Sequence, residues 1–171
     1  MKSKPTLPNL FGEKHRPQFH FSPKVNWMND PNGMVYYNGK YHLFYQYNPG
    51  DKVWGDMNWG HASSSDLLHW HHHEPALISE ADGLGYIFSG SAVVDWKNTS
   101  GLQQTAHPPL VALFTHSSRY DHQVQSLAFS VDGGESWQKY SHNPVIKNPG
   151  ITDFRDPKVI WHPSTNSWIM T

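Results

Sequence analysis

Apolar and polar residues alternate over short runs of the chain, glycine and proline recur every few residues, and little of the sequence has the period of an amphipathic helix. Asn38-Gly39 separates the runs Met34–Asn38 and Tyr41–Tyr47, and this dipeptide is a strong signal for a two-residue β-hairpin. Further strands are predicted at Trp59–Ser63, Ile87–Val94, Leu110–Thr115, Val124–Ser130, Pro157–Trp161 and Ser167–Thr171. Turn signals at intervals of roughly 8–12 residues favour an all-β sandwich, barrel or propeller.

An internal repeat distinguishes among these architectures. Ala62–Trp70 and Ala128–Trp137 both read Ala-x-Ser-x-Asp followed by a tryptophan, and they lie 66 residues apart. Phe88–Val94 and Phe154–Ile160 are offset by the same 66 residues, and Met28–Pro31 resembles the same strand entry. A repeat of this length built from about four short strands is typical of a propeller blade.

The second copy of the repeat also predicts a specific turn. Asp132, within Ser-x-Asp-x-Gly-x-Ser-Trp, is expected to accept hydrogen bonds from backbone N–H groups of a tight turn, and Trp137 is expected to pack between blades.

The length of the repeat sets the number of blades. At 66 residues per blade the chain of 171 residues holds about 2.6 blades, whereas propellers have roughly four to eight. We therefore expect an N-terminal extension at 1–18 and an incomplete N-terminal part of a propeller domain at 19–171.

Composition excludes several classes of protein and site. With 13 Lys and Arg against 14 Asp and Glu, the net charge of −1 argues against a nucleic-acid partner. No apolar run approaches the roughly 18 residues of a membrane helix, and the absence of cysteine excludes disulfides and thiolate sites. The polar stretch Met1–His20 lacks a signal peptide, so the protein is expected to be cytoplasmic as written, or secreted if a leader is missing. The oligomeric state stays open.

Two Asp-Pro pairs are the strongest candidates for chemistry. Asp30 and Asp156 each precede a proline at equivalent repeat positions, and equivalent strands of a propeller converge on one channel. Either pair alone is more often a structural turn, but together they predict two carboxylates in one pocket, as glycosyl transfer requires. Asn29 and Asn32 flank Asp30 and are expected to donate to it. Because adjacent strand residues point to opposite faces, Arg155 need not pair with Asp156.

Other polar and aromatic residues are assigned with less specificity. Gln46, Asn48, Trp54 and Trp59 follow the first hairpin and are candidates for a sugar-binding rim, although each tryptophan more often packs in a core. The cluster at 69–73 contains four histidines, but strand alternation sends His71 and His73 to one face and His72 to the other, without a zinc-binding spacing. We therefore expect neither a metal nor another cofactor.

Five ordered blocks of sequence resemble glycoside hydrolase family 32, which contains invertases, levanases and exo-inulinases. The matching blocks are Trp27–Gly33, Phe44–Pro49, Trp59–Ala62, Phe88–Ser91 and Arg155–Pro157. The resemblance implies a five-bladed propeller followed by a C-terminal β-sandwich that this chain does not contain. It also implies release of terminal β-D-fructofuranosyl units from levan, inulin or sucrose by a retaining double displacement, with fructose-containing saccharides as the partner molecules.

The resemblance also assigns roles to individual residues. It implies that Asp30 is the nucleophile and that Asp156 stabilises the transition state. It implies a substrate-binding pocket made by Asn29, Gln46, Trp54, Phe88, Ser89 and Arg155. The acid/base glutamate of the family is expected about one blade beyond Arg155-Asp156-Pro157, outside the chain, so the chain alone is expected to be inactive.

Three alternatives stay open at this point. The chain is a non-catalytic, carbohydrate-binding propeller fragment if Asp30 and Asp156 only hold a sugar. Residues 125–134 are more similar to fructan β-fructosidases, whereas the absence of a signal peptide favours a cytosolic sucrose hydrolase. An arabinan- or xylan-specific furanosidase also uses an inward aspartate, but the Asn-Asp-Pro-Asn-Gly block argues against it.

Overall fold

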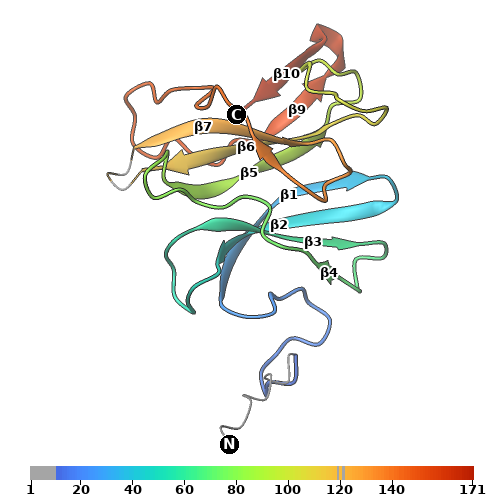
Figure 1. Ribbon diagram of the computed structural model, residues 1–171, viewed down its shortest axis with the longest axis vertical. Helices are drawn as coiled ribbons and strands as arrows, with labels where there is room; N and C mark the ends of the chain where they lie inside the picture. Colours follow the sequence, from blue (N-terminus) through green and yellow to red (C-terminus); the bar gives the residue numbers. More distant parts are fainter. Residues whose placement is uncertain (1–10, 119, 121) are drawn as a thin grey trace, which may run out of the picture.

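The computed structural model describes residues 11–118, 120 and 122–171. The regular elements within these residues are β-strands and one short 3₁₀ turn (Figure 1). The first sheet has the order β1-β2-β3-β4 and is antiparallel throughout. Its strands are β1 (Trp27–Tyr37), β2 (Lys40–Asn48), β3 (Asn58–Ser64) and β4 (His71–His72). Asn38 and Gly39 join β1 to β2 with φ of 49° and 81°, the backbone of the predicted two-residue hairpin.

The second sheet repeats this arrangement. It is antiparallel with the order β5-β6-β7-β8, and its strands are β5 (Tyr86–Val94), β6 (Leu110–Ser117), β7 (Gln123–Ser130) and β8 (Gln138–Lys139). A separate hairpin follows, formed by β9 (Val159–His162), the 3₁₀ turn η1 (Pro163–Thr165) and β10 (Ser167–Met170). Among the described residues, no helix is long and apolar enough to cross a membrane.

The pairing of the outer strands confirms the repeat. In the first sheet Ala62 of β3 lies opposite His72 of β4, and in the second sheet Ala128 of β7 lies opposite Lys139 of β8. The predicted turn also forms, because Asp132 Oδ1 accepts the backbone N–H of Ser136 at 3.0 Å. Each sheet is therefore one blade of an incomplete propeller, and β9–β10 begins the next.

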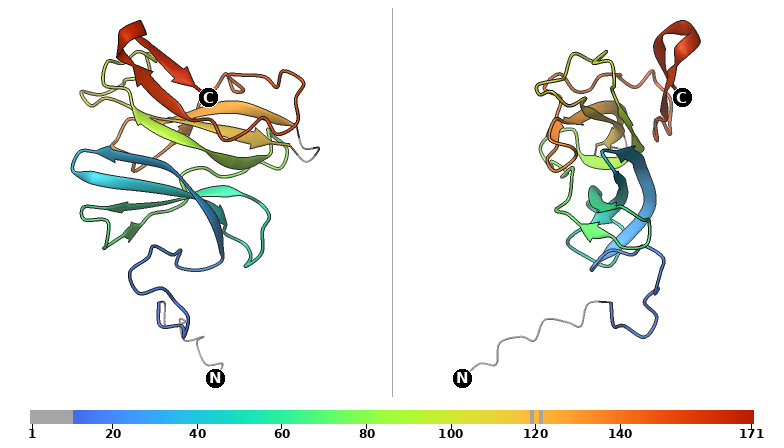
Figure 2. Two further views of the ribbon diagram at one scale, coloured as in Figure 1. Left: turned by 180° about the vertical axis from the view of Figure 1, so that it is seen from behind. Right: turned by 90° about the vertical axis from the view of Figure 1, so that its right-hand side faces the viewer.

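Side chains from both sheets make up the core. Phe44 and Trp59 of the first sheet and Ile87 and Phe114 of the second are all fully buried in one cluster. Trp137 packs edge-on against Phe44 with ring centroids 5.1 Å apart, so the tryptophan of the turn lies between the blades as predicted. Burial of these large aromatic surfaces fixes the two sheets against each other, and β1 lies beside β5 (Figure 2).

The segment before β1 covers the outer part of the first sheet. Phe21 contacts Tyr45, Trp70 and His72, with ring centroids 5.1–5.4 Å apart. The predicted extension at 1–18 falls partly on residues 1–10, which lie outside the described residues.

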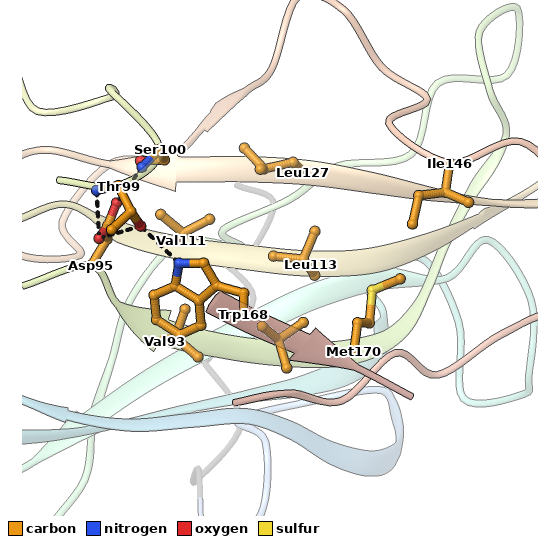
Figure 3. Close-up of a pocket in the computed structure, with 11 residues that line it drawn as sticks. Val93, Asp95, Thr99, Ser100, Val111, Leu113, Leu127, Ile146, Trp168 and Met170 are labelled. Atoms are coloured by element: carbon orange, nitrogen blue, oxygen red, sulfur yellow. Dashed lines mark hydrogen bonds between the residues drawn. The ribbon is translucent and has the colours of Figure 1, made fainter. Parts of the chain in front are cut away.

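The β9–β10 hairpin lies over one face of the second sheet and encloses an apolar cavity of about 260 Å³ (Figure 3). Val93, Val111 and Leu113 line it from the sheet, and Trp168 and Met170 line it from the hairpin. Trp168 Nε1 donates a 2.7 Å hydrogen bond to the hydroxyl of Thr99, next to buried Asp95 at one end of this cavity. Neither Asp30 nor Asp156 lines this cavity, so it is separate from the predicted chemistry.

Candidate active site

Asp30 lies near the start of β1, where the strand departs from regular pairing. A register shift separates Met28 from Pro31, as expected where proline removes a donor from the ladder. The carboxylate of Asp30 is exposed, and its Oδ2 accepts a 2.8 Å hydrogen bond from the hydroxyl of Ser89 in β5. Asn32 Nδ2 donates to the same hydroxyl at 3.4 Å. The first two blades are thus joined directly at this carboxylate.

The donor to Asp30 differs from the sequence-based expectation. The side chain of Asn29 instead contacts Trp27, whose Nε1 donates to Asn29 Oδ1 at 2.9 Å. Asn32 donates to the hydroxyl of Ser89, which in turn donates to Asp30. The predicted side-chain support of the carboxylate therefore exists, but a serine from the neighbouring blade supplies it.

Asp156 lies before β9 rather than within a strand. Its φ of 62° is in the left-handed region, which aspartate tolerates better than most residues. Its backbone N–H donates to Thr115 Oγ1 at 3.1 Å. Ser91 of β5 fastens the residues that follow, because its hydroxyl donates to the carbonyl of Pro157 at 2.9 Å and accepts from the N–H of Val159 at 3.0 Å.

The charges of the two aspartates act on each other. Partial burial raises the pKa of Asp156, the guanidinium of Arg155 opposes that rise, and the negative charge of Asp30 adds to it. The hydroxyls of Ser89 and Ser91, two positions apart on β5, bond the Asp30 carboxylate and the carbonyl of Pro157, so one strand holds both Asp30 and the segment of Asp156, which are 126 residues apart in the sequence. A site of this kind can hold one carboxylate ionised as a nucleophile beside a second that contacts substrate hydroxyls.

Arg155 contacts Asp156 more closely than strand alternation predicts. Its Nε lies 3.8 Å from Asp156 Oδ2, and its Nη1 donates to the carboxylate of Asp153. The alternation rule does not apply here, because both Asp153 and Asp156 have positive φ and residues 153–158 lie outside the strands. The half-exposed guanidinium is therefore held between two carboxylates at the rim of the site.

Aromatic side chains form a wall beside the carboxylates. Phe88 precedes Ser89, and the ring of Trp54 meets it edge-on at 6.3 Å. Trp54 is 54% exposed, so its indole is available to a ligand, as predicted for a rim residue. Trp59 is instead fully buried and donates its Nε1 to the carbonyl of Phe88 at 2.9 Å, which makes it a core residue and corrects the rim assignment.

Two polar candidates from β2 are buried and bound to backbone. Gln46 Nε2 donates to the carbonyl of Ile87 at 3.1 Å, one residue before Phe88. Asn48 Nδ2 donates to the carbonyl of Val53 at 2.9 Å and thereby shapes the loop that carries Trp54. Both side chains position the loop and strand that border the site.

Sequence reasoning missed two residues that support Asp156. Thr115 and Gln125 lie opposite each other on β6 and β7, and the Thr115 hydroxyl donates to Gln125 Oε1 at 2.8 Å. Gln125 Nε2 in turn donates to the carbonyl of Phe154 at 2.8 Å. Both residues lie among other polar residues at one end of each strand, so their pairing could be recognised only once the strand register was known.

The histidine cluster does not form a metal site. His72 turns towards Phe21 while His71 and His73 contact each other at 4.6 Å, as the alternation predicted. In the part of the chain that the structure describes, no group of three or more potential ligands is arranged to hold a metal ion.

Comparisons with known proteins agree with this geometry. Residues 20–171 match the description "Glycosyl hydrolases family 32 N-terminal domain". The chain is 58% identical over 162 residues to a levanase of Bacillus subtilis, covering 95% of this chain and 24% of that protein. It is 44% identical over 182 residues to an extracellular exo-inulinase of Aspergillus ficuum, covering 94% of this chain and 34% of that protein.

Solved structures of related enzymes also match the chain. The crystal structure of exo-inulinase from Aspergillus awamori matches with a TM-score of 0.87 at 44% identity, over 94% of this chain and 35% of that one. A fructofuranosidase from Schwanniomyces occidentalis complexed with fructose matches with a TM-score of 0.87 at 46% identity, over 96% of this chain and 33% of that one. The chain spans about a quarter to a third of the length of these relatives. Five ordered motifs, two propeller blades and these matches lead to one conclusion: the chain belongs to glycoside hydrolase family 32 and corresponds to its N-terminal domain.

Proposed function

We propose that the protein carrying this chain is a retaining glycosidase that releases terminal β-D-fructofuranosyl units from fructans or sucrose. The relatives named levanase, exo-inulinase and fructofuranosidase support this substrate class. The paired carboxylates of Asp30 and Asp156 supply the type of groups that this chemistry uses.

In the first step the Asp30 carboxylate attacks the anomeric carbon of the terminal fructosyl unit. The bond to the leaving oxygen breaks, that oxygen takes a proton from a general acid, and a covalent fructosyl-enzyme forms. The resemblance to the family assigns this acid to a glutamate beyond residue 171. The hydrogen bond from Ser89 holds Asp30 Oδ2 in place, which leaves the other oxygen for attack.

In the second step a water molecule attacks the same carbon, while the acid/base residue takes a proton from that water. The bond between this carbon and the Asp30 carboxylate breaks, and fructose is released with its original configuration. Asp156 and Arg155, which lie 3.8 Å apart, are suited to hydrogen-bond the fructosyl hydroxyls, and the bond accepted by the Asp156 carboxylate becomes stronger as positive charge develops on the ring. Phe88 and Trp54 provide an apolar wall for the sugar ring.

The observation that carries the proposal is the contact between blades at Asp30. The hydroxyl of Ser89 in β5 bonds the carboxylate of Asp30 in β1, and the hydroxyl of Ser91 in the same strand bonds the carbonyl of Pro157, next to Asp156. Three consecutive structural repeats thus contribute to one site.

Substitution of the nucleophile tests the proposal. In the full-length protein, Asp30→Asn is expected to lower fructose release from sucrose, inulin and levan by at least about a thousandfold, because an amide cannot form the covalent intermediate. Fructose release is measured enzymatically, with exposed Asp82→Asn as the control that keeps parental activity. Substantial turnover by Asp30→Asn would remove Asp30 from the nucleophile role, and sugar binding without turnover in the parent would favour a purely carbohydrate-binding function.

A further inference from the structure

The two sheets carry an equivalent pair of buried side chains on their second and third strands. In the first sheet Gln46 of β2 lies opposite Trp59 of β3, and in the second sheet Thr115 of β6 lies opposite Gln125 of β7. All of these side chains are buried. Trp59 and Gln125 are 66 residues apart, which is the length of the repeat, so the two pairs occupy the same place in successive blades.

The first pair reaches the strand that enters the second blade. Gln46 Nε2 donates to the carbonyl of Ile87 at 3.1 Å, and Trp59 Nε1 donates to the carbonyl of Phe88 at 2.9 Å. Both carbonyls belong to β5 and directly precede Ser89, whose hydroxyl bonds the candidate nucleophile. The first pair therefore fixes the backbone immediately before a residue of the candidate site.

The second pair reaches the segment that leads into β9. Gln125 Nε2 donates to the carbonyl of Phe154 at 2.8 Å, and Phe154 lies 66 residues after the phenylalanine that Trp59 bonds in the first blade. Thr115 Oγ1 accepts the backbone N–H of Asp156 at 3.1 Å and donates its own proton to Gln125 Oε1 at 2.8 Å. These hydrogen bonds close a ring around the backbone from Phe154 to Asp156.

The ring holds a backbone conformation that an aspartate does not favour by itself. The φ of Asp156 is 62°, in the left-handed region, where a residue other than glycine persists only if its surroundings hold it there. Asp156 lies outside the strands, so a sheet ladder does not supply those contacts. The bonds from Thr115 and Gln125 do supply them, and they thereby set the direction in which the carboxylate leaves the backbone.

We infer that Thr115 and Gln125 are positioning residues for Asp156 in the proposed reaction. The inference rests on the proposed function, in which the Asp156 carboxylate accepts hydrogen bonds from fructosyl hydroxyls. Both side chains are buried and bond the backbone of this segment and each other, so they act on Asp156 rather than on the substrate. A misplacement of about 1 Å can cost about a hundredfold in rate, so loss of the ring lowers kcat more than it changes KM.

Replacement of the Thr115 hydroxyl tests the ring. Thr115→Val keeps the branched side chain but removes both of its hydrogen bonds. In the full-length protein it is expected to lower kcat for sucrose about 10- to 100-fold, with KM within about threefold of the parental value. Thr115→Ser keeps the hydroxyl and is expected to retain kcat within about threefold. An unchanged kcat in Thr115→Val overturns the inference.

Ser126→Ala is the matched control for a general loss of stability. Ser126 follows Gln125 on β7, so its side chain points to the opposite face of the sheet, where its hydroxyl bonds His116 Nδ1 at 2.7 Å. The substitution removes a buried hydrogen bond between the same two strands without touching the ring, and kcat is expected to stay within about twofold. A loss of kcat equal to that of Thr115→Val would overturn the inference.

A double substitution shows whether Thr115 acts through the Asp156 carboxylate. Asp156→Asn removes the charge that the ring is inferred to orient. In the Asp156→Asn protein, Thr115→Val is therefore expected to lower the residual kcat less than about threefold, far from the product of the two single effects. Losses of kcat that multiply would overturn the inference, because Thr115 would then act independently of that carboxylate.

Hydrogen exchange separates this inference from the proposed function. The amide of Asp156 is bound to Thr115 Oγ1, so it is expected to exchange about tenfold faster in full-length Thr115→Val than in the parent or in Thr115→Ser. Mass spectrometry of overlapping peptides that span residues 154–159 measures this rate. Equal rates overturn the ring alone. Faster exchange in Thr115→Val, in a protein whose parent releases no fructose, overturns the catalytic proposal and leaves the ring as the support of Asp156.

Discussion

Three consecutive residues of β5 have different roles at the candidate site. The hydroxyl of Ser89 bonds the carboxylate of Asp30, and the hydroxyl of Ser91 bonds the backbone that follows Asp156. Gly90, between them, lies against β6 so closely that an added Cβ would be 2.0 Å from the carbonyl oxygen of Leu113. The two serines share one face because side chains alternate along a strand, and the glycine permits the backbones to approach.

Gly90→Ala tests this close approach. The added methyl group meets backbone atoms, which cannot rotate away, so β5 and β6 must separate. We expect the free energy of unfolding to fall by about 2–3 kcal/mol, measured by urea denaturation. Gly50→Ala is the control, since its nearest neighbour would be Asn48 Oδ1 at an ordinary 3.5 Å, and a change within about 0.5 kcal/mol is expected there. Equal stability of the Gly90→Ala and Gly50→Ala proteins would contradict the packing of β5 on β6.

At the scale of elements, the long strands were predictable from apolar alternation, and the first hairpin from Asn38-Gly39. The two-residue strands β4 and β8 were not, because two residues carry no periodicity. β1 begins at Trp27, earlier than the predicted run from Met34, and continues through Pro31. An edge strand tolerates this proline, because one side of β1 has no partner in its sheet.

A stack of histidines crosses the first blade. His42 Nδ1 of β2 and His61 Nε2 of β3 are 3.1 Å apart, and His61 stacks on His73 with ring centroids 4.3 Å apart. Burial is the largest cause that lowers the pKa of all three imidazoles, to about 2 for His61. Lys40 lowers the pKa of all three further, and His71 lowers those of His61 and His73, whereas Glu135 opposes the effect at His42 and His73. The folded blade therefore keeps this stack neutral at pH values where an unfolded chain binds protons.

This stack predicts that stability falls on acidification. Below about pH 6.5 the histidines of the unfolded chain bind protons and those of the folded stack do not. Proton binding therefore stabilises the unfolded state and lowers the free energy of unfolding. For each histidine that stays neutral in the fold, the free energy of unfolding is expected to decrease by about 2 kcal/mol as the pH falls from 6.5 to 5. Urea denaturation over this range measures the slope. Replacing buried His61 by Gln is expected to reduce it, whereas replacing exposed His15 by Gln is not. A slope unaffected by His61→Gln would contradict the assignment.

On the scale of the whole molecule, the candidate site exists because three repeats converge. The equivalent positions of the two Asp-Pro pairs in the repeat predict that Asp30 and Asp156 lie together, and the segments of both residues bond the same strand, β5. The contacts that hold Asp156, from Thr115 and Ser91, depend on the register of strands in another blade, which alternation within one strand does not specify. The roles of the site residues in catalysis stay predictions.

The distribution of glutamates leads to a prediction for the chain expressed alone. Within the described residues, Glu13 pairs with Arg16, Glu80 with Lys139 and Glu135 with Lys40, while exposed Glu74 lies in the loop after β4. None of these contacts reaches Asp30, so no glutamate is placed to protonate a leaving group. Hydrolysis of sucrose by the 171-residue chain is therefore expected to be about 10²–10⁴-fold slower than by the full-length protein.

The missing proton donor is distinguishable from a site that has not formed. Fluoride leaves without protonation, so β-D-fructofuranosyl fluoride bypasses the need for a general acid. If Asp30 and Ser89 are arranged as in the structure, the chain alone should release fluoride in an initial burst while sucrose stays nearly uncleaved, as followed with a fluoride electrode. Asp30→Asn should abolish the burst, and circular dichroism should show the same fold for both proteins. Equal, slow release of fluoride by the parent chain and Asp30→Asn would mean that two blades and a hairpin do not by themselves assemble a reactive nucleophile.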